Sequence, residues 1–154
     1  MPCYGRWEET EVDHGGRRLP KSDDLTLIVL KGHLLAEAEL NELLEGLLRK
    51  PRPYLKVKPS WPQRVALVEA LIGVNQTVWW LEALGRLNTI RNELAHQLEP
   101  RALEVQIGKF CDLVEPMTAK EAFRGAGISK RLKLCLGLLC GHVAHVRKTW
   151  HGDE

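Results

Sequence analysis

The chain lacks any apolar run that approaches the length needed to span a bilayer, about 18 residues or more. It also lacks a basic N-terminal region followed by a short apolar stretch, which is the usual pattern of a secretory signal. Neither membrane insertion nor secretion is indicated, so we expect a cytoplasmic protein that makes no membrane contact. With 154 residues, the chain is most simply one domain that can bury a hydrophobic core without disulfides or metals.

Cysteine is scarce, and neither sign of charge dominates the composition. The four cysteines show no CxxC spacing and lack the density of a disulfide-stapled secreted scaffold: Cys3, Cys111, Cys135 and Cys140. We therefore expect reduced thiols. The formal net charge of +2 is too small to predict a nucleic-acid-binding protein from electrostatics alone. Any polyanion would have to be bound by a local patch.

No segment shows the alternation of apolar and polar residues that marks a half-buried strand, and no repeat of solenoid length is present. Helical periodicity instead predicts helices over residues 25–49, from 60 or 61 to 72, 79–98, 101 to about 114, around 119–123 and 129 to about 150. The predicted fold is all-α, a bundle of four main helices with an additional C-terminal helix.

The domain organisation follows from the same pattern. Residues 1–23 mix glycine, proline and charges without periodicity, which predicts an irregular N-terminal arm. The helical domain covers residues 24–154. Apolar residues of the first helix occupy more than one stripe, so we expect other helices to contact it from more than one side.

The predicted helix over residues 79–98 carries the most informative pattern in the chain. One continuous apolar stripe contains Trp80, Ala83, Leu84, Leu87, Ile90, Leu94 and Leu98. Beside it runs a polar arc that contains Asn88, Arg91, Asn92 and His96. Arg91 lies within about 40° of the middle of the apolar side. A guanidinium in that position needs a partner, a neighbouring chain or an anionic ligand.

The segment RNELAH, residues 91–96, contains the groups that RNA cleavage by 2′-hydroxyl attack requires. That reaction needs a proton acceptor, a proton donor and a cation that stabilises the phosphate oxygens, and it needs no metal. Histidine serves as acid or base near neutral pH, and arginine binds phosphate with a planar fork. Asn92 and His96 are four residues apart on adjacent turns, so the amide can orient the imidazole or the phosphate.

Two structural readings stay open for these residues. The spacing of five between Arg91 and His96 is imperfect for one phosphate on a single helix, whereas two helices facing each other across a two-fold axis would bring two pairs into one cleft. Alternatively, Arg91 forms an ion pair with a glutamate of the first helix such as Glu37, and His96 stabilises the helix end through the macrodipole.

The pattern RN-x-x-A-H late in a helix of an all-α domain resembles the R-x4-6-H motif of the HEPN superfamily. This superfamily includes small bacterial toxin ribonucleases and mannitol-repressor-like proteins, and the resemblance covers roughly residues 24–115. It implies that the helical domain has a core over 24–115, folded as a four-helix up-and-down bundle, and a C-terminal extension over 116–154. It also implies a homodimer with a metal-independent ribonuclease site in the dimer cleft, built from Arg91, Asn92 and His96 without a cofactor. A toxin of this kind would have an antitoxin or nucleotidyltransferase partner. The resemblance also allows, as alternatives to the ribonuclease, a non-catalytic regulator similar to the mannitol-repressor group and, third, a nucleotide-binding module.

Three further features have simpler explanations beside the functional ones. The set Cys135, Cys140, His142 and His145 offers zinc-type ligands, but four ligands spread around one helix cannot close a tetrahedron, so we interpret them as buried cysteines and ordinary histidines. The set Lys130, Arg131, Lys133, Arg147 and Lys148, near Trp150, either helps to hold RNA or forms a solvated helix face. His33 is interpreted as a surface or half-buried histidine, with a supporting role in a site as the alternative.

Overall fold

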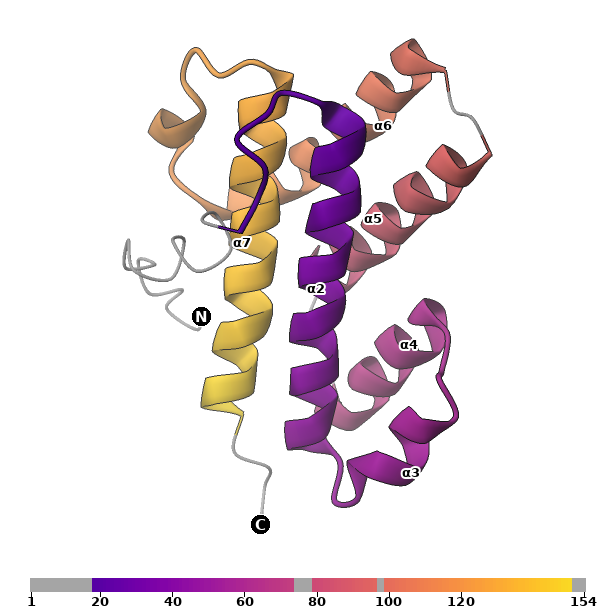
Figure 1. Ribbon diagram of the computed structural model, residues 1–154. Coiled ribbons are helices and arrows are strands. Elements are labelled where there is room, and N and C mark those ends of the chain that lie inside the picture. The colour runs from indigo at the N-terminus through magenta and orange to yellow at the C-terminus, as the bar shows by residue number, and fades with distance from the viewer. Residues whose placement is uncertain (1–17, 74–78, 97–98, 151–154) are drawn as a thin grey trace.

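The computed structural model describes residues 18–73, 79–96 and 99–150 (Figure 1). Most of the predicted N-terminal arm, including Cys3, lies outside the described residues, as does Leu98 of the predicted apolar stripe. The described helices are α2 (Leu25–Leu47), α3 (Pro51–Lys56), α4 (Trp61–Ile72), α5 (Trp79–Ala95), α6 (Pro100–Val114) and α7 (Ile128–Thr149), with 3-10 turns η1 (Glu115–Met117) and η2 (Lys120–Phe123). Because these ranges contain no strand, the predicted all-α class is confirmed.

Local signals fix where two of the helices begin and end. Asp24 precedes α2, and its carboxylate accepts a hydrogen bond of 3.1 Å from the backbone N–H of Leu27. Ser60 precedes α4 and forms a reciprocal capping box with Gln63. Gly73 ends α4 with a φ of +64°, a left-handed conformation that favours glycine.

The proline-rich connection after α2 contains a short helix that the sequence pattern did not predict. α2 ends at Leu47, two residues before the predicted end, because Leu48 is already extended. Pro51 and Pro53 fall in the first turn of α3, where a missing N–H breaks no helical hydrogen bond. Proline therefore starts a helix here as well as ending one.

The helices form two layers (Figure 1). α2 and α7 lie side by side and run in the same direction, while α4, α5 and α6 cross behind them. The close approach of α2 and α7 depends on Gly32, since a Cβ atom built there would lie 2.5 Å from Cδ1 of Leu136. α2 also contacts α4 and α5, as its wide apolar surface predicted.

α7 belongs to the hydrophobic core. Its buried side chains form one cluster with those of α2, α5 and α6, and they include Leu132, Cys135, Leu136, Leu139, Cys140 and Val143. None of the described helices has the length and apolar character needed to cross a membrane.

α5 buries the face that its periodicity predicted. Trp80, Ala83, Leu84, Leu87 and Ile90 are all buried, and Leu94 is partly buried. The short connection from α5 to α6 makes these two helices antiparallel neighbours (Figure 1). The polar arc beside this buried face lies next to α2 and the start of α4.

Candidate functional site

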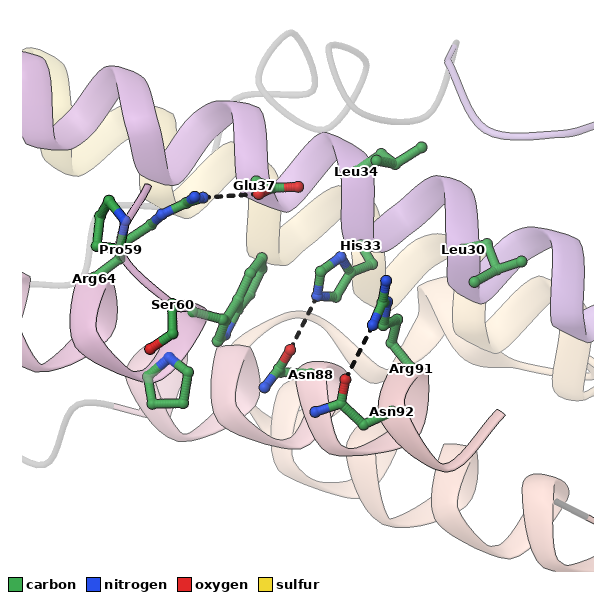
Figure 2. Close-up of a pocket in the computed structure, with 12 residues that line it drawn as sticks. Leu30, His33, Leu34, Glu37, Pro59, Ser60, Arg64, Asn88, Arg91 and Asn92 are labelled. Atoms are coloured by element: carbon green, nitrogen blue, oxygen red, sulfur yellow. Dashed lines mark hydrogen bonds and ion pairs between the residues drawn. The ribbon is translucent and has the colours of Figure 1, made fainter. Parts of the chain in front are cut away.

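A groove of about 620 Å³ lies between α2, the start of α4 and α5 (Figure 2). Its lining comprises Leu30, His33, Leu34, Glu37, Pro59, Ser60, Trp61, Pro62, Arg64, Asn88, Arg91 and Asn92. The groove therefore combines two cations, one carboxylate, one imidazole and two amides with apolar walls.

α5 contributes three polar side chains to the groove. Asn88, Arg91 and Asn92 have the spacing i, i+3 and i+4, which places them on one helix face. Nη1 of Arg91 donates a hydrogen bond of 3.2 Å to Oδ1 of Asn92 (Figure 2). Arg91 is exposed and forms no ion pair with any described residue. Its guanidinium thus keeps most of its donors for a ligand.

His33 faces these residues from α2. It is 8% exposed, and its Nε2 lies 3.2 Å from Oδ1 of Asn88 (Figure 2). The imidazole stacks on the indole of Trp61, with ring centroids 4.2 Å apart. Trp61 is fixed in turn, because its Nε1–H donates to the backbone oxygen of Leu84 at 3.1 Å. His33 is therefore oriented by contacts with α4 and α5.

Burial lowers the pKa of His33, and nearby groups modify the effect. Desolvation is the main cause of the lowered pKa; the hydrogen bond to Asn88 and the charge of Glu37 oppose it, whereas the charges of Arg91 and Arg64 reinforce it. The imidazole is consequently neutral near pH 7. Since Asn88 presents Oδ1 as an acceptor, Nε2 carries the proton and Nδ1 carries the lone pair.

The second arginine of the groove is already neutralised. Nη1 of Arg64 lies 2.7 Å from Oε1 of Glu37, and both side chains are partly buried. Glu37 therefore pairs with Arg64 and not with Arg91, the pairing considered above. This ion pair leaves Arg91 as the groove cation available to an anion, among the residues that the structure describes.

His96 lies outside the groove. It is exposed and is the first residue after α5, where its backbone N–H donates to the oxygen of Glu93 at 3.0 Å. Five residues of helix separate it from Arg91 by about 7.5 Å along the axis. A single subunit thus brings Arg91 and Asn92 into one groove and leaves His96 beyond its end.

The sequence pattern placed Asn88 on the polar arc but gave it no role, and it did not single out the groove position of His33. The spacing of Asn88 to Arg91 is a local signal that could have suggested a shared site. His33 and Arg64 have no such signal, because their approach to α5 is a tertiary contact.

The cysteines and histidines of α7 do not converge. Cys135 and Cys140 are buried free thiols, and burial raises the pKa of Cys140 to about 12. His142 packs against Trp79 with ring centroids 4.9 Å apart. Desolvation lowers the pKa of His142 to about 4, with a further contribution from His145. In the described ranges, these histidines do not join the cysteines in a group of metal ligands.

A different set could hold a metal ion. Cys111, Glu115 and Cys135 have ligand atoms within 4.8 Å of one another. However, Oε1 of Glu115 already accepts a hydrogen bond of 2.6 Å from Nε of Arg131. The pKa of Cys135 is raised by its hydrogen bond with Cys111 and by burial, which keeps the thiol protonated and works against metal binding.

Three of the basic residues of α7 are engaged within the chain. Arg131 pairs with Glu115 and, at 3.3 Å, with Asp112. Lys133 lies 3.9 Å from Asp23, and Arg147 pairs with Glu42. Lys130 and Lys148 are exposed. These contacts favour the solvated-face interpretation of the basic set over a role in RNA binding.

No protein-family model, no curated protein and no solved structure matches the chain. The groove and the α5 motif are therefore the basis for a functional proposal.

Proposed function

We propose that the protein is a metal-independent endoribonuclease in which the groove holds a phosphodiester of RNA. The observation that supports this most is Arg91: an exposed guanidinium in the groove that forms no ion pair with any described residue. Asn88 and Asn92, which line the same groove, offer amide donors for further phosphate oxygens. His96, on the same helix, supplies a group that can accept or donate a proton near neutral pH.

The proposed active form is a homodimer. His96 lies beyond the end of the groove, so a two-fold axis that brings two copies of α5 together would place each His96 beside the partner's groove. Two leucines beside Arg91 support such a contact, because Leu30 and Leu34 are 41% and 57% exposed. α2, α4, α5 and α6 would then correspond to the four helices of the up-and-down bundle of the HEPN superfamily, with α7 as the additional helix.

The proposal extends to a toxin that acts on cytoplasmic RNA and is held in check by an antitoxin or nucleotidyltransferase protein. Its basis is the motif RNELAH together with the groove beside it.

RNA cleavage in EDTA tests the proposal directly. Purified protein should convert single-stranded RNA into fragments that end in 2′,3′-cyclic phosphate, and both Arg91→Ala and His96→Ala should lower the rate by about 100-fold or more. Arg86→Ala is the matched control, because Arg86 lies on α5 outside the groove and pairs with Glu82 at 3.1 Å. Absence of cleavage by the unaltered protein, or full activity of the His96 variant, would contradict the assignment.

An apolar strip on α2 favours a second candidate, a non-catalytic regulator that acts through protein contacts. Leu27, Leu30 and Leu34 are all exposed on this helix. In that case Arg91 would stabilise the contact between subunits. Arg91→Ala would then change the molar mass measured by light scattering, and the unaltered protein would show no nuclease activity.

A further inference from the structure

The groove contains an imidazole that the motif on α5 does not include. His33 is fixed by Asn88 on one side and by Trp61 on one ring face. Its second ring nitrogen, Nδ1, forms no hydrogen bond with any described residue. A neutral imidazole whose Nε2–H is already engaged presents one lone pair, and His33 lines the same groove as Arg91.

We propose that His33 is the proton acceptor for the 2′-hydroxyl in the groove, with Asn88 as the residue that positions its ring. This inference rests on the ribonuclease function proposed above. It gives the base and the acid to different helices: His33 on α2 accepts the proton, and His96 at the end of α5 donates one.

Imidazoles from two subunits fit this division. Asn88, which positions His33, lies about 4.5 Å before Arg91 along the axis of α5, so His33 lies on that side of a phosphate bound to Arg91. His96 of the same helix lies beyond the groove, and the proposed two-fold axis places the partner's His96 beside the groove instead. In-line displacement at phosphorus needs a group on each side, because the attacking and leaving oxygens lie on opposite sides of the phosphorus atom.

The chemical step is balanced by these two groups. Nδ1 of His33 takes the proton of the 2′-hydroxyl while O2′ forms a bond to phosphorus. The bond from phosphorus to O5′ breaks, and O5′ receives a proton from the protonated imidazole of the partner's His96. Arg91 stabilises the charge on the two remaining phosphate oxygens. The products are a 2′,3′-cyclic phosphate and a 5′-hydroxyl.

The charges that surround His33 make its basicity respond to substrate. Glu37 on α2, Arg64 on α4 and Arg91 on α5 face the ring. Without ligand, the charge of Arg91 disfavours protonation of His33. A bound phosphodiester neutralises that charge, so His33 becomes more basic when the 2′-hydroxyl is in place.

The first test compares the pH dependence of kcat/KM for His33→Gln, His96→Gln and the unaltered protein on a single-stranded oligoribonucleotide in EDTA. His33→Gln should lower kcat/KM by about 100-fold or more and remove the low-pH limb, because no base remains to be deprotonated. Circular dichroism and thermal unfolding verify that the variant is folded. A folded His33→Gln protein that keeps the low-pH limb would overturn the role of His33 alone. Absence of cleavage by the unaltered protein would overturn the ribonuclease as well.

A substrate with sulfur in place of O5′ assigns the base and the acid separately. A thiolate leaves without protonation, since a thiol has a pKa of about 8.5. This substrate should restore the rate of His96→Gln and leave His33→Gln impaired. Restoration of His33→Gln instead would reverse the two roles and overturn the proposal.

NMR spectroscopy measures the tautomer and the pKa of His33 without any cleavage of substrate. With ¹⁵N-labelled histidine, His33 should be the Nε2–H tautomer, and its pKa should rise when a 2′-deoxy oligonucleotide that cannot be cleaved is added. The rise should be absent in Arg91→Ala and present in Arg86→Ala. A His33 signal that does not respond to saturating oligonucleotide would refute contact between this ring and the phosphodiester.

Discussion

The indole of Trp61 and the imidazole of His33 stack at an interplanar angle of 28°, which joins the start of α4 to the middle of α2. The same indole donates a hydrogen bond to the backbone oxygen of Leu84 on α5. Trp61 thus connects the three segments that line the groove, and its burial makes it a structural support for the groove wall.

Replacing Trp61 should destabilise the fold. Trp61→Phe loses the hydrogen bond to Leu84 and leaves unfilled volume, so we expect the free energy of unfolding to fall by about 1–3 kcal/mol in urea titrations. Trp150→Phe is the matched control: Trp150 is 37% exposed at the end of α7, and its replacement should change stability by less than about 0.5 kcal/mol. Equal effects of the two substitutions would contradict the supporting role of Trp61.

A carboxylate at position 88 should raise the pKa of His33. In Asn88→Asp, a negative charge would replace the amide oxygen that lies 3.2 Å from Nε2, so the pKa should rise by about one unit or more. Asn88→Leu should lower it, because the hydrogen bond to Asn88 favours the charged ring. Histidine NMR titration measures both shifts. A larger change in the pKa of His33 in Asn92→Asp than in Asn88→Asp would contradict the contact between His33 and Asn88.

Two glycines of α2 should respond to alanine in opposite ways. Gly32→Ala should lower the free energy of unfolding by about 1–3 kcal/mol, because its methyl group would overlap Leu136 in the α7 interface. Nothing lies within 4 Å of a Cβ at Gly46, so Gly46→Ala should raise stability by up to about 1 kcal/mol through helix propensity. Urea denaturation of the two variants distinguishes a packing effect from a backbone effect. A stabilising Gly32→Ala would mean that α7 can move away from α2 at little cost.

Stability should decrease as the pH falls from about 7 to 4, in part because of His142. Its pKa is about 4 in the folded protein and 6.5 in an exposed histidine, so the unfolded chain takes up a proton first. The neutral His142 ring therefore adds its full contribution to the free energy of unfolding above pH 6.5. That contribution declines toward pH 4, by up to about 3 kcal/mol. His142→Leu should flatten this part of the curve measured by urea titration. The pKa of His33 is also lowered, so His33 adds to the pH dependence of stability in both the unaltered protein and the variant. If the free energy of unfolding depended on pH in the same way in His142→Leu, the burial of His142 would be contradicted.

Much of the fold could be predicted because helical periodicity is local. The apolar stripe of α5 identified its buried residues from Trp80 to Ile90, and periodicity predicted helices that begin at residue 25 and at residue 60 or 61, which is where α2 and α4 begin. α3 was not predicted, because proline ends one helix and begins another with the same geometry. The pairing of α7 with α2 could not be predicted from periodicity, since the two helices are distant in sequence.

The sequence by itself determined which faces of the helices are buried and which residues of α5 share a polar face, because both depend on spacing along one helix. Only the tertiary structure decided that His33 meets Asn88, that Arg64 pairs with Glu37 and leaves Arg91 without an ion pair to any described residue, and that His96 lies beyond the groove. The reason is physical: an apolar stripe specifies that a helix must be covered, whereas the volumes of all the interlocking side chains decide which helix covers it.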